Sequence, residues 1–228
     1  MAETKALGTL AQVLDSAFPS GMFIHSFGIE AHIKQGKVES AADLELFLKN
    51  IITDQYQRLE FQTAKSVYNY AAAEALLPII RADFAFSSML TFPYAKAYKT
   101  IGENILSHIK SLEPNQAVTK RYFAAACEKK TPCNEIVLLS IFACDLCIDI
   151  KLFLALWSKR SLGALGLCAL KISKIKPSEV QRMLFGMDGF LDEALDEALK
   201  RSGAMNFNPF FDETAYKHKS LESKMFAT

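Results

Sequence analysis

The sequence predicts an all-α protein, a single-domain orthogonal bundle of about eight to ten helices. No glycine lies between Gly36 and Gly102. Tight hairpin turns depend on glycine, so this stretch favours long helices over strands. Prolines at 78, 93, 114, 132 and 177 stand where helices are expected to begin or end.

The N-terminal part is expected to form three helices. The first covers residues 6–17 and ends at residues 18–21, where proline and glycine break it. A short helix covers residues 27–35. Ser40 and Asp43 have the spacing of a capping box, and the helix that they start is expected to continue to about residue 75. Later helices are expected to begin near Pro93, Pro114 and Asn134.

The most apolar stretch covers residues 136–157 and is predicted to be one buried or interface helix. Asp145, Asp149 and Lys151 interrupt it, which argues against a membrane span. The two aspartates lie four residues apart, and paired carboxylates can serve acid–base chemistry. On a helix such pairs are more often a solvated or interface edge, which is the reading that we favour.

The last long helix begins at Pro177 and has charged residues opposite an apolar face. Asp196 with Lys200, and Glu197 with Arg201, have the order that favours i,i+4 ion pairs. A single helical domain is therefore expected over residues 1–203, with a partner-binding tail over residues 204–228.

Composition excludes several classes of function. The chain has 228 residues, with 26 Lys and Arg against 25 Asp and Glu, so no broad nucleic-acid surface is expected. The first nine residues have no apolar core of a signal peptide. The five cysteines, an odd number, are therefore expected to be reduced thiols in a cytoplasmic protein without a membrane segment.

Catalytic and metal motifs are weak. Cys144 and Cys147 have C-x-x-C spacing but lie in an apolar helical run, so we expect small core residues. His25 and His32 lie seven residues apart and lack a third ligand. No P-loop, H-E-x-x-H, G-x-S-x-G or G-x-G-x-x-G motif occurs. We expect no catalytic residue, no metal site and no resident cofactor.

Residues 18–30, Phe-Pro-Ser-Gly-Met-Phe-Ile-His-Ser-Phe-Gly-Ile-Glu, are unlike a helix or a strand. Pro19 and Gly21 would fix a turn, and Gly28 would allow close approach of backbone. Aromatic and histidine side chains on a rigid loop suit a recognition surface. A loop that plugs its own core would have the same composition, and composition alone leaves both readings open.

This loop resembles the N-terminal signature of the UreF family of urease accessory proteins, and the tail 221–228 resembles the aromatic ending of that family. The departures are Pro93 and Ala95 in place of a frequent Glu-x-Arg pair, Glu135 and Ser140 in place of His and Gly, and Lys224 in place of Arg. The matching loop residues are Pro19, Gly21, Phe23, His25, Ser26, Phe27, Gly28 and Glu30.

The resemblance implies a non-enzymatic chaperone in the cytoplasm. Such a protein forms a homodimer, binds a UreD/UreH-type accessory protein and recruits the UreG-type GTPase, and the assembly inserts nickel into apo-urease. Two alternatives stay open: a helical metalloprotein or enzyme using His25 and His32, and a helical adaptor in an unrelated pathway. The residues expected to bind partners are Phe23, His25, Phe27, Glu30, Tyr216, Leu221, Lys224, Met225 and Phe226.

The end of the tail is expected to be loose in the isolated protein. Tyr216, Leu221, Met225 and Phe226 would form an apolar stripe on a helix too short to be stable alone. Such a segment would gain order in a partner's groove. The alternative is that the tail folds back on its own core.

Overall fold

The computed structural model describes residues 3–206, 208–219, 221 and 223–228. Within these ranges the regular elements are helices, so the predicted all-α class is confirmed. The first half contains α1 (Glu3–Leu14), the 3₁₀ turn η1 (Met22–Ile24), α2 (Ile29–Lys34), α3 (Ala41–Asn50), the π-helix η2 (Ile51–Glu60), α4 (Phe61–Ala72), α5 (Leu76–Ser88) and α6 (Phe92–Ile109). The second half contains α7 (Ala117–Cys127), α8 (Glu135–Asp145), α9 (Ile150–Ile172), α10 (Pro177–Gly186), α11 (Asp188–Lys200) and α12 (Pro209–Lys219).

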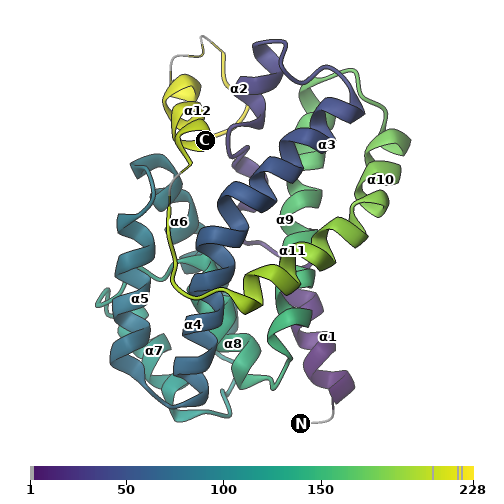
Figure 1. The fold of residues 1–228 in the computed structure, drawn as a ribbon. Coiled ribbons are helices and arrows are strands. Elements are labelled where there is room, and N and C mark those ends of the chain that lie inside the picture. Colours follow the sequence, from purple (N-terminus) through teal and green to yellow (C-terminus); the bar gives the residue numbers. More distant parts are fainter. Residues whose placement is uncertain (1–2, 207, 220, 222) are drawn as a thin grey trace.

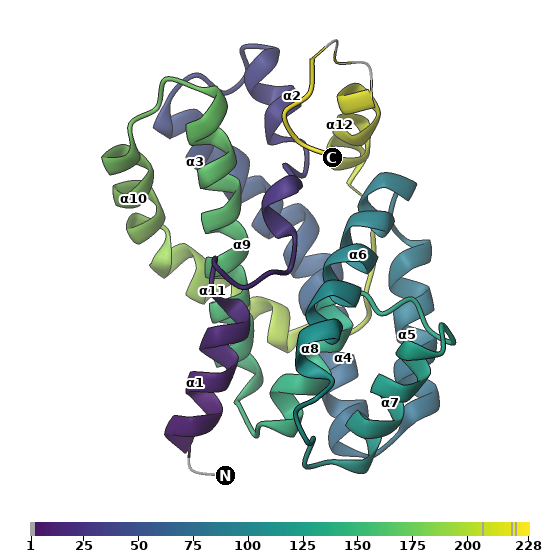
Figure 2. The same cartoon turned by 180° about the vertical axis from the view of Figure 1, so that it is seen from behind.

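The helices pack as one body around α4, α8 and α9 (Figure 1). All eleven residues of α8 are buried, because α8 is apolar on every side and lies between α4, α6 and α9. Gly102 allows α6 to approach the start of α8, since a Cβ there would lie 1.9 Å from the carbonyl oxygen of Cys133. Seen from behind, α1 runs along α9 (Figure 2).

The predicted start of the third helix is confirmed. Ser40 and Asp43 form a capping box, with the backbone N–H of Asp43 donating to Ser40 Oγ at 3.2 Å. The helix then runs on through α3, η2 and α4, as the long apolar pattern predicted. The π-helical stretch brings Gln55 and Glu60 into the interior, where the Gln55 amide donates to the Glu60 carboxylate at 3.1 Å.

The expectation of one helix over residues 136–157 is wrong. The helix is interrupted between α8 and α9. Cys147 has a left-handed backbone conformation there, with a φ of 57°. Asp149 caps α9 by accepting a hydrogen bond from Leu152 N at 3.1 Å. Asp145 also does not lie on a solvated edge of a helix. It is buried, and its carboxylate accepts from the backbone N–H groups of Asn115 and Gln116 just before α7. Both aspartates therefore hold helix ends.

The thiols also differ in part from expectation. Cys144 is buried as predicted, whereas Cys147 is exposed because it follows the end of α8. All five cysteines are free thiols in the structure. Burial raises the pKa of the Cys144 thiol, which lowers its reactivity.

The predicted last long helix is broken at Met187 into α10 and α11. Arg201 pairs with Glu197 at 3.3 Å, as predicted. Asp196 instead accepts from Lys151 of α9 at 2.7 Å, so tertiary packing replaces the local pair expected with Lys200.

One helix, α9, is long and apolar enough by composition to cross a membrane. In its most apolar window 61% of the residues are buried inside the protein. Its neighbours include α1, α2, α8, α10 and α11, so it is a core helix of the bundle.

The tail is not loose. Helix α12 packs against α2 (Figure 1). Phe211, Ala215 and Phe226 are buried. Phe226 packs in a groove of the same chain whereas Tyr216 and Met225 stay exposed, so the expectation that the tail is loose is wrong. Parts of this tail, residues 207, 220 and 222, lie outside the described residues.

Candidate protein-binding site

The loop over residues 18–30 is shaped by turns. After α1 ends, Asp15 accepts a hydrogen bond from Ala17 N at 2.7 Å, and Pro19 lies exposed at the next turn. Gly21 and Gly28 have φ values of 77° and 90°, which other residues rarely adopt. A Cβ on Gly28 would lie 2.5 Å from Thr214 Oγ1, so glycine here allows the loop to touch α12.

Residues 223–228, hereafter the terminal segment, are bound to this loop by backbone hydrogen bonds. Ala227 N donates to Ile24 O at 2.6 Å, and Ser26 N donates to Thr228 O at 2.6 Å. The Ser26 hydroxyl also donates to Thr228 O. Two segments about two hundred residues apart therefore pair along their backbones.

The Glu30 side chain of α2 holds the terminal segment in place by hydrogen bonds. Its carboxylate is fully buried and accepts from Met225 N at 2.8 Å, Phe226 N at 3.2 Å, His218 Nε2 at 3.0 Å and Lys34 Nζ at 2.8 Å. Burial raises the pKa of the carboxyl, but these four donors outweigh burial and hold the pKa of Glu30 below its ordinary value. Glu30 is therefore the anion on which the loop, α12 and the terminal segment converge.

His25 is the second polar anchor of the site. It is 6% exposed, and its Nδ1 shares a hydrogen bond with Thr228 Oγ1 at 3.0 Å. Burial lowers the pKa of His25 to about 4, so the ring is neutral near pH 7. Among the described residues His25 Nε2 has no hydrogen-bond partner, and the ring lines a hollow between α6, α12 and the terminal segment.

Several residues expected to touch a partner are buried instead. Phe27 lies between the rings of Tyr94 and Tyr98, with centroid distances of 5.7 and 5.4 Å. Phe226 is buried with the Lys171 ammonium 5.7 Å from its ring centroid. Like His25 and Glu30, they shape the site and in this structure are not available to another protein.

The exposed side of the site is apolar and basic. Ile24 is 53% exposed and Met225 is 59% exposed, and both flank the paired backbones. Lys224 and Tyr216 are also exposed, and Leu221 is half-buried. A partner would meet these five side chains, of which the sequence predicted all except Ile24.

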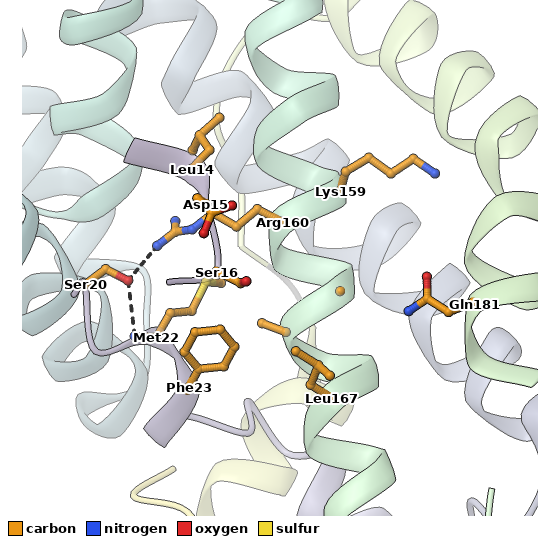
Figure 3. A pocket seen from close by; sticks show the side chains of 12 residues that line it. Leu14, Asp15, Ser16, Ser20, Met22, Phe23, Lys159, Arg160, Leu167 and Gln181 are labelled. Carbon is orange, nitrogen blue, oxygen red and sulfur yellow. Dashed lines mark hydrogen bonds between the residues drawn. The ribbon is translucent and has the colours of Figure 1, made fainter. Parts of the chain in front are cut away.

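Phe23 faces a second hollow, together with Ser20 and Met22 of the loop (Figure 3). This hollow of about 210 Å³ lies between the end of α1, the loop and α9. Arg160 crosses it, donating to Ser20 Oγ at 2.8 Å and forming an ion pair with buried Glu135. One of the departures from the UreF pattern, Glu135, thus has a structural role in holding the loop on α9.

His25 and His32 do not share partners. His32 Nδ1 lies 3.0 Å from Gly28 O, and its ring stacks on Phe47 at 4.9 Å. Within the described ranges, no group of three or more His, Cys, Asp or Glu residues could hold a metal ion. The geometry therefore gives no support to a metal bound between these two histidines.

Sequence reasoning missed the connection between the ends. Ser26 stands out in the sequence only as part of the family pattern, and no local pattern singles out His218. The signal that could have found the pairing is Glu30, a charged residue between apolar neighbours on α2, because a buried carboxylate requires donors from elsewhere.

The described residues form an all-helical bundle in which the two chain ends build one apolar and basic surface. The family model described as UreF matches residues 38–188. The chain therefore belongs to the UreF family, and the resemblance expected from its sequence is confirmed. The matched range includes most of the bundle and leaves out the loop and the terminal segment.

One relative extends the match over nearly the whole chain. The urease accessory protein UreF of Bacillus sp. (strain TB-90) is 24% identical over 225 residues, which cover 96% of this chain and 97% of that protein. The urease accessory protein UreF of Cereibacter sphaeroides (strain ATCC 17025 / ATH 2.4.3) is 43% identical over 49 residues, 22% of this chain and 23% of that protein.

Proposed function

We propose that this protein is a urease accessory protein that acts as a binding scaffold during urease maturation. Membership of the UreF family and the names of its relatives support this role. The observation that carries the proposal is the seating of the terminal segment on the loop at residues 18–30, which builds one surface from two ends of the chain.

In this proposal the first partner is a UreD/UreH-type accessory protein, which binds over the exposed side chains of Ile24, Tyr216, Lys224 and Met225. A clustered apolar patch with a charged rim is typical of protein interfaces. The complex then recruits a UreG-type GTPase and acts on apo-urease in the cytoplasm. The nucleotide chemistry and the nickel insertion belong to the assembly, and this chain supplies binding and no catalysis.

We further propose that the scaffold is a homodimer, because closed two-fold dimers are the commonest soluble oligomers and the family resemblance implies one. Size-exclusion chromatography with light scattering measures this directly. A monomeric mass at every concentration would contradict the dimer, but it would not affect the proposal about the partner proteins.

The test of the function is co-purification. This chain, carrying an affinity tag, is co-expressed with the UreD/UreH-type and UreG-type proteins of its source, and both are expected to be retained. If neither protein is retained from cells that express all of them, the proposal is wrong.

Matched variants test whether the partner binds over these exposed side chains. Met225→Asp should abolish retention, whereas Leu77→Asp on α5, which is similarly exposed at 57%, should leave retention unchanged. Lys224→Glu should weaken retention more than Lys224→Arg, since only the first reverses the charge. Equal loss of partner retention for Met225→Asp and Leu77→Asp would show that the partner does not bind at this surface.

A further inference from the structure

The outer face of α6 borders two hollows that share three residues. The first, of about 420 Å³, lies between α6, Ile24 of the loop, α12 and the terminal segment. The second, of about 630 Å³, lies between α6, α5 and the turn at residues 129–132. Phe92, Lys96 and Thr100 line both hollows, so the two lie on either side of one row of α6 side chains, and together they are called the α6 groove hereafter.

Apolar side chains stand open in this groove. Phe92 is 75% exposed at its centre, and Phe84 of α5 and Ile24 are each 53% exposed on its two walls. Large exposed apolar side chains gathered in one groove mark a place where another molecule binds. The helix periodicity explains the alignment, because Phe92, Lys96 and Lys99 follow one another at spacings of four and three on one face of α6.

The charged side chains that line the groove are mostly positive. Its lining contains Lys96, Lys99, Lys129 and Lys224 against one acid, Glu103, and Lys129 Nζ pairs with that acid at 2.7 Å. Over the described stretches, Lys96 and Lys99 form no ion pair within the chain. The groove thus presents uncompensated positive charge beside apolar surface.

We propose that the α6 groove binds an acidic, amphipathic helical segment of a partner protein. Its apolar side chains pack on Phe84, Phe92 and Ile24, and its carboxylates meet Lys96 and Lys99. Helix-in-groove binding with charge complementarity at the rim is a recurrent form of protein recognition. The groove shares Ile24 and Lys224 with the surface proposed above for UreD/UreH-type binding and extends from it along α6 to α5 and the turn at residues 129–132. Phe84, Lys96 and Lys99 lie outside that surface, so binding of an acidic helix can be tested apart from the urease role.

The probe is a fluorescein-labelled synthetic peptide that forms an amphipathic helix with leucines on one face and glutamates along its edges. Fluorescence anisotropy with the full chain should show saturable binding that weakens as salt is added. The double variant Lys96→Glu with Lys99→Glu should weaken binding by about tenfold or more. The matched double variant Lys110→Glu with Lys120→Glu changes two exposed lysines away from the groove and should bind like the wild type.

Two control peptides separate apolar from charged recognition. One replaces every glutamate by glutamine, and the other keeps the composition but scrambles the order so that no apolar face forms. Both should bind about tenfold more weakly than the first peptide. Equal binding of the scrambled peptide, equal loss in the two double variants, or no binding of the first peptide would each overturn the proposal.

Light scattering of the chain alone tests the competing occupant, a second copy that offers its acidic α11. Self-association that the Lys96→Glu and Lys99→Glu changes abolish would assign the groove to that copy and overturn the proposal. If the peptide binds as expected but no accessory protein co-purifies, the groove stands and the proposed function fails, so the two failures can be told apart.

Discussion

The Glu30 carboxylate and the His218 imidazole lie 3.0 Å apart although 188 residues separate them in the sequence. Glu30 belongs to α2, next to the N-terminal loop, and His218 belongs to the last helix. The same carboxylate also accepts from the backbone of Met225 and Phe226. Glu30 therefore holds the two ends of the chain together.

Glu30→Gln should release the terminal segment while the helical bundle stays folded. Glutamine offers one acceptor oxygen in place of two, and its NH₂ group would face the donors that the carboxylate now accepts. Trypsin cleavage after Lys217 and Lys224 should become about tenfold faster, and amide exchange at Met225 and Phe226 should accelerate. Glu193→Gln, on the exposed face of α11, is the control and should change neither rate.

Removing residues 225–228 should lower the melting temperature. The deletion takes two backbone donors from buried Glu30 and exposes the groove that Phe226 fills. A loss of about 2–4 kcal/mol in the free energy of unfolding is expected from an undersatisfied buried carboxylate and a lost aromatic contact. An unchanged melting temperature in thermal circular dichroism would contradict this docking.

Acidification should destabilise the protein through His25. Its pKa is lowered from 6.5 to about 4 in the fold, so below pH 6.5 the unfolded chain takes up a proton that the folded chain does not. The contribution of neutral His25 is complete above pH 6.5 and is lost as the pH falls towards 4, by about 3 kcal/mol. Urea unfolding of wild type and His25→Gln at several pH values should show a shallower acid loss in the variant; parallel curves would count against it.

Glu60 should act in the opposite direction. Burial raises the pKa of this carboxyl from 4.5 to about 7, so between these values the folded chain keeps a proton that the unfolded chain has released. Stability should therefore fall by about 3 kcal/mol as the pH rises from 4.5 to 7.

Glu60→Gln keeps an acceptor for the Tyr98 hydroxyl, which now donates to Glu60 at 2.7 Å. The variant should equal wild type below pH 4.5 and exceed it at pH 8. A variant that is less stable than wild type at pH 8 would show that the charged carboxylate contributes to the fold.

The sequence was sufficient for the fold class and for most helix starts, because capping residues and proline act locally. The Ser40–Asp43 box and the helix that begins at Pro177 are examples. It failed at the breaks after Asp145 and Gly186, where the pattern of apolar residues continues across the turn.

For the site, the loop residues were predicted but not their arrangement. Nothing local in the sequence indicates that Thr228 pairs with Ser26 or that His218 reaches Glu30, because these contacts join segments about two hundred residues apart. Phe27 and Phe226 have the same composition signal whether they face a partner or the core. Only the structure shows that they face the core.

The pairing of Ile24 and Ser26 with Ala227 and Thr228 also sets an order in time. The loop leaves the ribosome early, and the residues that complete the surface are translated about two hundred codons later. A chain whose residues 223–228 have not yet been synthesised cannot display this surface. A partner that binds there would engage only chains in which this segment has been made and has docked on the loop, so the surface distinguishes folded chains from unfinished ones.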